Sequence, residues 1–143
     1  MLKAILSVMV VVCSFSVLKA SEPSDRLIQA LIKVEMKHDD FDIGDKHLVN
    51  KAYGPLQIRQ PYMTDAMGKK HRAQECLGNR ELSIRVVKKY MARYATVENL
   101  GHEPTDEDFA RIHNGGPDGA TKESTKAYWA KVQKALRQLD KEG

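Results

Sequence analysis

Several stretches of this sequence carry apolar residues at the three- and four-residue spacing of an amphipathic helix. Ser24, Thr105 and either Ser124 or Thr125 are suited to cap the helices that begin there, and Pro61 suits the first turn of a short helix ending near Met67. A further helix is expected over about residues 81–95. The stripes consist of Leu27, Ile28, Leu31 and Ile32; Leu82, Val86, Val87, Tyr90, Met91 and Tyr94; and Tyr128, Trp129, Val132, Leu136 and Leu139. We therefore expect a mainly helical core.

Residues 39–58 follow a different pattern. Phe41-Asp42-Ile43 alternates between apolar and polar residues, Gly44-Asp45 suits a turn, and Tyr53-Gly54-Pro55 interrupts the chain before another apolar segment. This pattern predicts a small β-hairpin after the first helix, anchored in the core by Phe41 and Ile43. The predicted fold class is α+β, mainly helical.

The first twenty residues are typical of a secretory signal peptide. A positive start is followed by an apolar run from Ala4 to Leu18 and by the small residues Ala20 and Ser21. The run is shorter than the ~20 residues needed to span a bilayer. We expect cleavage after Ala20, secretion to the extracellular space or periplasm, no membrane attachment after cleavage, and one domain over residues 21–143.

The charge of the chain is mild. Residues 1–20 hold Lys3, Lys19 and no acid, so the net charge of +4 falls to +2 in residues 21–143. This value does not favour nucleic-acid binding. The histidines lack the spacing of metal ligands, so we expect neither a metal nor a cofactor. Cys76 is the one cysteine of this part, which excludes an internal disulfide there, and we expect a monomer whose core alone stabilises it.

Glu35 is the strongest catalytic candidate. It continues the buried stripe of the first helix, seven residues after Ile28, and lies near the C-terminal end, where the helix dipole disfavours negative charge. Both effects favour a protonated carboxyl group, which is what a general acid requires. The alternative from position alone is a side chain that turns into solvent.

A second carboxylate is expected near Glu35. Four aspartates follow within ten residues, and Asp45 is best placed, because a hairpin tip at Gly44 could fold back over Glu35. Asp42 is a second choice, and solvated surface residues are the plain alternative. Two carboxyl groups flanking a bond are the machinery of glycoside hydrolysis.

Two further segments supply candidate substrate contacts. Tyr53 and Gln57 surround the Gly-Pro turn, and the amide of Gln57 suits hydrogen bonds to sugar hydroxyls or an N-acetyl group. His113 and Asn114 precede Gly115-Gly116-Pro117, where two glycines let the backbone approach a ligand. A histidine at a helix end is also a common structural partner.

Taken in order, these segments resemble the lysozyme-like superfamily, most of all invertebrate-type lysozymes and more distantly soluble lytic transglycosylases. The resemblance spans about residues 27–136. It rests on Lys33-Val34-Glu35, Gly54-Pro55-Leu56-Gln57-Ile58 with Pro61-Tyr62, Tyr90-Met91-x-Arg93-Tyr94, Ala110 to Pro117, and Tyr128-Trp129-x-x-Val132.

The resemblance implies a muramidase that hydrolyses the β-1,4 bond between N-acetylmuramic acid and N-acetylglucosamine in peptidoglycan. It assigns the general acid to Glu35 and the sugar cleft to Gln57 and Asn114. This sequence departs from the family in two ways: it lacks the family's many disulfides, and His47 falls where the family has an Asp. The alternatives are therefore a lytic transglycosylase that uses Glu35 alone, or a catalytically silent peptidoglycan-binding domain.

Overall fold

The computed structural model describes residues 21–143. Its helices and strands follow in the order α1 Asp25–Glu35, β1 Ile43–Gly44, β2 Ala52–Tyr53, α2 Gln60–Met67, η1 Ala73–Cys76, α3 Arg80–Tyr94, α4 Val97–Leu100, α5 Asp106–Gly115, η2 Glu123–Thr125 and α6 Lys126–Glu142. The α+β, mainly helical fold class is thereby confirmed. The expected signal peptide lies outside the described residues. Among residues 21–143, no helix is both long and apolar enough to cross a membrane.

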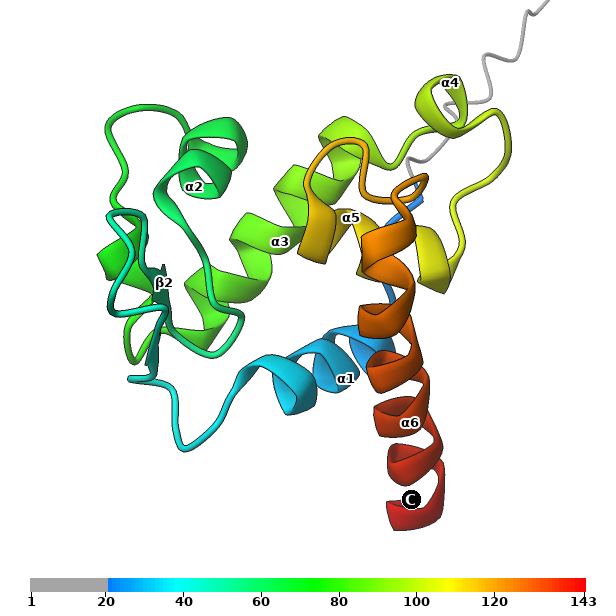
Figure 1. Ribbon diagram of the computed structural model, residues 1–143, viewed down its shortest axis with the longest axis horizontal. Coiled ribbons are helices and arrows are strands. Elements are labelled where there is room, and N and C mark those ends of the chain that lie inside the picture. Colours follow the sequence, from blue (N-terminus) through cyan, green and yellow to red (C-terminus); the bar gives the residue numbers. More distant parts are fainter. Residues whose placement is uncertain (1–20) are drawn as a thin grey trace, which may run out of the picture.

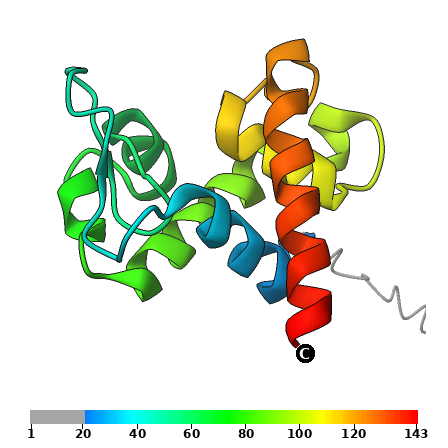
Figure 2. The ribbon, with the colours of Figure 1, turned by 60° about the horizontal axis from the view of Figure 1, so that its bottom comes forward.

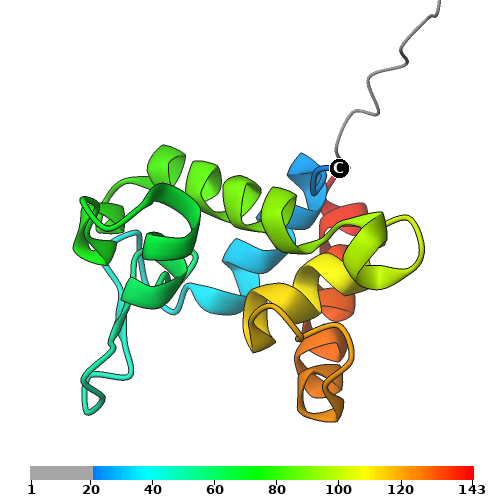
Figure 3. The same cartoon turned by 90° about the horizontal axis from the view of Figure 1, so that it is seen from above.

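Helix α3 is the central element of the molecule. It runs between the part that holds the β-hairpin and α2 and the part that holds α4, α5 and α6 (Figures 1 and 3). Helix α1 packs lengthwise against α6, and α5 packs against both α6 and α3. Helix packing thus brings α1, near the start of the described residues, against α6, near their end.

The predicted caps of α1 and α5 are confirmed. The side chain of Ser24 accepts a hydrogen bond from the backbone N–H of Leu27, and Thr105 forms a capping box with Asp108. The prediction for α6 was wrong, because the side chain of Thr125 makes no capping bond. Its hydroxyl instead donates within the preceding loop and accepts a hydrogen bond from the buried side chain of Arg111.

The core is formed by the apolar stripes of α1, α3, α5 and α6. Leu27, Leu31, Val86, Met91 and Val132 are each fully buried. Tyr128, which the sequence suggested as part of the core, is also buried, although its hydroxyl has a polar partner at the end of α1.

The β-hairpin is present but is not anchored as expected. Strands β1 and β2 pair antiparallel with Ile43 opposite Tyr53, and the loop between them projects from the body of the molecule (Figure 2). Phe41 is 68% exposed and lies against Gly78 rather than in the core, so its predicted anchoring role was wrong. Ile43 is half-buried.

Polar links hold the base of the hairpin instead. The backbone carbonyl of Asp42 accepts from the N–H of Gly54 at 2.9 Å, and the carbonyl of Asp40 accepts from the N–H of Gly78 at 2.8 Å. The carboxylate of Asp40 also pairs with Arg80 at the start of α3. These bonds fasten the segment before the hairpin to the start of α3, and the buried Ala52 of β2 adds apolar contact.

Cys76 yields a prediction for stability. Its side chain is fully buried, and burial raises the pKa of its thiol. Because Cys76 is the one cysteine of residues 21–143 and is inaccessible, we expect a reducing agent to leave the melting temperature of this part of the chain unchanged. Calorimetry with and without reductant tests this expectation, and a drop of several degrees would contradict it.

Candidate active site

Glu35 is the last residue of α1 and lies where three helices meet. Its side chain is 20% exposed, as expected for a residue at the edge of the buried stripe. The hydroxyl of Tyr128, in the first turns of α6, donates a hydrogen bond of 2.7 Å to Glu35 Oε1. Burial, helped by the charge of Glu35, raises the pKa of Tyr128 well above its usual value. Tyr128 therefore remains an O–H donor to the carboxyl group.

His113 approaches the same carboxyl oxygen from α5. Its side chain is only 4% exposed, and its Nε2 lies 3.6 Å from Glu35 Oε1. Its Nδ1 lies 3.2 Å from the hydroxyl of Tyr62. Burial lowers the pKa of His113, although the negative charge of Glu35 opposes the shift. The imidazole is thus neutral at neutral pH, and its contact with Glu35 is not an ion pair under those conditions.

An aromatic cluster supports His113 from the side of α2 and α3. The rings of Tyr62 and Tyr90 stack with their centroids 3.6 Å apart and an interplanar angle of 14°. Tyr62 also meets His113 edge-on at 5.6 Å. This packing restricts the orientation of the imidazole and joins α2, α3 and α5 at one wall of the site.

Glu35 opens into a cavity of about 450 Å³, which we call the cleft. Residues from the end of α1, the hairpin, α2, α3 and the end of α5 line it. They are Glu35, Asp45, Ala52, Gln57, Arg59, Pro61, Tyr62, Asp65, Tyr90, His113, Asn114, Gly116 and Pro117. The structure therefore brings together five of the six residues that the sequence suggested: Glu35, Asp45, Gln57, His113 and Asn114.

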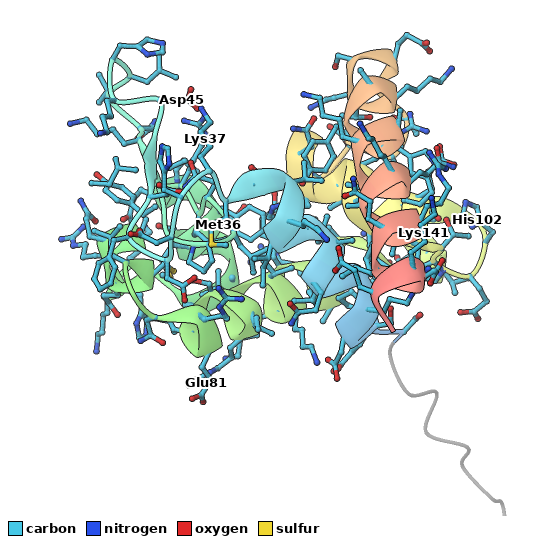
Figure 4. The ribbon with its side chains drawn as sticks, turned by 90° about the horizontal axis from the view of Figure 1, so that it is seen from below. Met36, Lys37, Asp45, Glu81, His102 and Lys141 are labelled. Atoms are coloured by element: carbon cyan, nitrogen blue, oxygen red, sulfur yellow. The ribbon has the colours of Figure 1, made fainter. Side chains whose placement is uncertain are left out.

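Asp45 lies on the hairpin loop directly after β1. It lines the cleft and also a neighbouring hollow of about 420 Å³ that Glu35 and Lys37 share. Figure 4 shows Asp45 at the base of the projecting loop, with Lys37 close by on the chain that leaves α1. The carboxylate of Asp45 forms an ion pair with Arg59, and its backbone has a φ of 48°. A positive φ is unfavourable for a residue other than glycine.

Asp42 is the other candidate carboxylate, and its side chain accepts hydrogen bonds from the backbone. Its Oδ2 accepts hydrogen bonds from the N–H groups of His38 and Lys37 at 2.7 Å and 2.6 Å. These bonds, that of His38 above all, lower the pKa of Asp42 below its usual value. Asp42 therefore closes the turn after α1 and lines only the neighbouring hollow, not the cleft.

Gln57 and Tyr53 differ from expectation in how their polar groups are used. The Gln57 amide donates to the carbonyl of Gly54 at 2.9 Å and, more weakly, to that of Asp42 at 3.3 Å, so it fastens the hairpin while lining the cleft. Tyr53 does not line the cleft; its hydroxyl accepts from Gln74 in η1. The structure therefore does not bring Tyr53 together with the other candidate residues in the cleft.

The sequence did not indicate that the hydroxyl groups of two tyrosines, Tyr128 and Tyr62, are hydrogen-bond partners in the site. Tyr128 fits the apolar stripe of α6 and Tyr62 follows a proline at the start of α2, so neither pattern indicates a role for the hydroxyl. The position of Tyr128, 93 residues from Glu35, shows why spacing could not reveal the contact.

Comparison with known proteins agrees with this arrangement. Residues 28–135 match the Destabilase family. The chain belongs to this family, which confirms the predicted resemblance to invertebrate-type lysozymes. It is 41% identical over 80 residues to lysozyme 1 of Crassostrea virginica, covering 56% of this chain and 42% of the relative. It is 39% identical over 82 residues to an invertebrate-type lysozyme of Ruditapes philippinarum, covering 57% and 58%. The chain thus spans about half the length of these curated relatives.

Solved structures of the same class share the fold. The crystal structure of Meretrix lusoria lysozyme in complex with Aeromonas hydrophila PliI aligns with a TM-score of 0.67 and 31% identity, covering 78% of this chain and 88% of that chain. The lysozyme of Tapes japonica aligns with a TM-score of 0.67 and 28% identity, covering 78% and 89%. The Destabilase-family fold therefore forms here with one cysteine in residues 21–143.

The hydrogen bond from Tyr128 to Glu35 yields a prediction. Replacing Tyr128 with Phe keeps the ring in the core but removes the donor to the carboxyl group. Hydrogen bonds to charged groups contribute about 1.5–3 kcal/mol to stability, so we expect the free energy of unfolding, measured by denaturant titration, to fall by about that amount. Tyr53→Phe is the matched control, because that hydroxyl contacts Gln74 outside the cleft. Equal stability of the two variants would show that the hydrogen bond from Tyr128 to Glu35 does not support the packing of α1 on α6.

Proposed function

We propose that this chain is a secreted lysozyme that cleaves the β-1,4 bond between N-acetylmuramic acid and N-acetylglucosamine in peptidoglycan. The observation that carries the proposal is the Glu35 carboxyl group, partly buried at the cleft and held by Tyr128. A domain that only binds glycans has no need for a carboxyl group held at the junction of three helices. Membership of the Destabilase family and the lysozyme-named relatives support the same reading.

Glu35 is the general acid in this proposal. Its Oε1 is engaged by Tyr128, whereas Oε2 accepts no hydrogen bond from the side chains or backbone of residues 21–143. Oε2 is therefore the oxygen that is free to carry a proton to the glycosidic oxygen of the leaving sugar. The bond between that oxygen and the anomeric carbon breaks as the proton is transferred, which leaves positive charge on the sugar ring.

Asp45 is the candidate partner that meets this charge from the opposite wall. In a retaining enzyme it attacks the anomeric carbon to form a covalent intermediate. Water then gives a proton to the deprotonated Glu35 and attacks the same carbon, which breaks the bond to Asp45 and releases the sugar with a free reducing end. This role requires carboxyl groups about 5–5.5 Å apart, against about 6.5–9.5 Å in an inverting enzyme. The ion pair with Arg59 holds Asp45 at the rim of the cleft.

The same ion pair favours a second candidate reaction. Because Arg59 already engages the Asp45 carboxylate, Glu35 could act without a partner, first as acid and then as base. The 6-hydroxyl of the substrate's own muramic acid then replaces water and loses its proton to Glu35. The products of this lytic transglycosylase reaction end in a 1,6-anhydro sugar.

The proposed substrate has consequences for the location of the chain and for its cofactors. Peptidoglycan lies outside the bacterial membrane, so the proposed function requires export, which agrees with the signal peptide expected in residues 1–20. We further propose that the chain acts as a monomer on glycan strands, with no cofactor and no metal in the cleft, because acid catalysis by carboxyl groups needs neither.

Replacing Glu35 with Gln tests the general acid. The amide keeps the shape of the side chain and can still accept from Tyr128, but it has no proton to transfer. We expect lysis to fall by about 10² or more, the scale of general acid catalysis. Glu81→Gln, the same change on the far side of the molecule from Asp45 in Figure 4, should retain full activity. Comparable lysis by a folded Glu35→Gln variant would remove Glu35 from the mechanism.

Replacing Asp45 with Asn distinguishes the two reactions. If Asp45 is the partner, the variant loses nearly as much activity as Glu35→Gln, and mass spectrometry of digested peptidoglycan finds free reducing ends in the wild-type products. Asp39→Asn is the matched control, because Asp39 belongs to the same acidic run but lines neither the cleft nor the neighbouring hollow. Full activity of Asp45→Asn together with anhydro ends would establish the transglycosylase.

A further inference from the structure

Beside the cleft, apart from the neighbouring hollow, lies another cavity of about 390 Å³, which we call the side pocket. It is formed by the end of α3, by α4 and by the loop between α5 and η2. Its polar and charged lining comes from Arg93, Tyr94, Asn99, Asp118 and Thr121. The proposed cleavage reaction does not use any of these residues.

The side pocket adjoins the cleft. Pro117 lines both. Asp65 lines the cleft, and it is held by two residues of the side pocket: the hydroxyl of Tyr94 donates to its carboxylate at 3.0 Å, and Arg93 Nη1 donates to its backbone carbonyl at 3.2 Å. A substrate bound in the cleft could therefore extend a branch past Pro117 and Asp65 without leaving the protein surface.

The side pocket carries opposite charges that are not paired with each other or with neighbours. Within residues 21–143, neither Arg93 nor Asp118 takes part in an ion pair. Arg93 uses one N–H on the Asp65 carbonyl, which leaves its other donors available. The carboxylate of Asp118 accepts no hydrogen bond from the described residues. Only the backbone carbonyl of Asp118 is engaged, and it accepts from the hydroxyl and the N–H of Thr121.

The lining of this pocket is poorly suited to another sugar. A sugar ring is commonly bound on an open aromatic face, and Tyr94 is the one aromatic residue of the side pocket. Its ring already contacts Tyr90, with centroids 4.7 Å apart, and the Arg93 guanidinium, 5.4 Å from the ring centroid. A ligand that carries both a carboxylate and an amino group fits the two free charges better.

We propose that the side pocket binds the peptide stem that branches from the muramic acid of peptidoglycan. Arg93 meets a carboxylate of the stem, and Asp118 meets the amino group of its diamino acid. This inference rests on the proposed function, because it takes the glycan of that same stem to be the occupant of the cleft. It makes the enzyme selective for strands that still carry peptides over bare glycan.

The test compares two soluble substrates, glycan fragments with peptide stems and the same fragments after an amidase has removed the stems. We expect Arg93→Ala and Asp118→Asn each to lower kcat/KM by about three- to fivefold on the stem-bearing fragments, the range expected for exposed charge pairs. Asp118→Asn should match the wild type on the bare fragments, and Arg93→Ala should lose less activity there than on the stem-bearing fragments, because Arg93 also donates to the carbonyl of Asp65 in the cleft. Arg85→Ala, which removes one charge from the opposite part of α3, is the control and should change neither rate.

A binding measurement separates this proposal from the proposed function. An N-acetylated L-Ala-γ-D-Glu-diaminopimelate-D-Ala tetrapeptide is titrated into the wild-type chain and the two variants and followed by NMR. We expect the Kd to be at least about threefold weaker in both variants. If the wild type cleaves neither substrate, the proposed function fails while the titration still decides the pocket. Equal losses on both substrates, or equal peptide binding by all variants, would overturn the proposal.

Discussion

A carboxyl group at the end of a buried helix face requires hydrogen-bond donors from other parts of the chain. Glu35 continues the stripe of α1 that contains Leu31 and Ile28, so its carboxyl group is partly removed from water. Removing such a group from water is costly unless hydrogen-bond donors replace the lost hydration. Tyr128 supplies the donor from α6, and His113 lies beside it from α5. The packing of α1 on α6 and of α5 on α6 is therefore also what assembles the catalytic wall.

The opposite wall of the cleft is held by different forces. The hairpin contributes little apolar burial, and backbone hydrogen bonds through Asp42, with the amide of Gln57, fix it in place. Asp45 and Gln57, both of which line the cleft, are the two residues with positive φ other than glycines in residues 21–143. Residues held in such conformations cost about 1–3 kcal/mol each and occur where the surrounding structure fixes them. One wall is therefore set by core packing and the other by polar contacts at the surface.

This difference explains what the sequence could and could not predict. The helices with clear stripes and caps, the hairpin and Glu35 at the end of its helix follow from local spacing, which the sequence shows directly. The contact between Tyr128 and Glu35 joins residues 93 positions apart, and the stripe of α6 gives Tyr128 the same pattern as a purely apolar residue. Phe41 was misjudged because an apolar residue in an alternating segment suggests burial, whereas Asp40 and Asp42 hold that segment through their backbone groups. The short elements η1, α4 and η2 carry no periodic signal.

The loop after α5 shows how the site is stabilised with one cysteine in residues 21–143. The guanidinium of Arg111 donates to the hydroxyl of Thr125 and the carbonyl of Lys122, each at 2.9 Å, so a single buried side chain ties both ends of η2 to α5. Gly119 lies so close to Arg111 that an added Cβ would come within 2.1 Å of the Arg111 carbonyl oxygen. These contacts hold the segment containing Pro117, which separates the cleft from the side pocket. A buried hydrogen-bond network, centred on the Arg111 guanidinium, thus fixes the loop that lines both cavities.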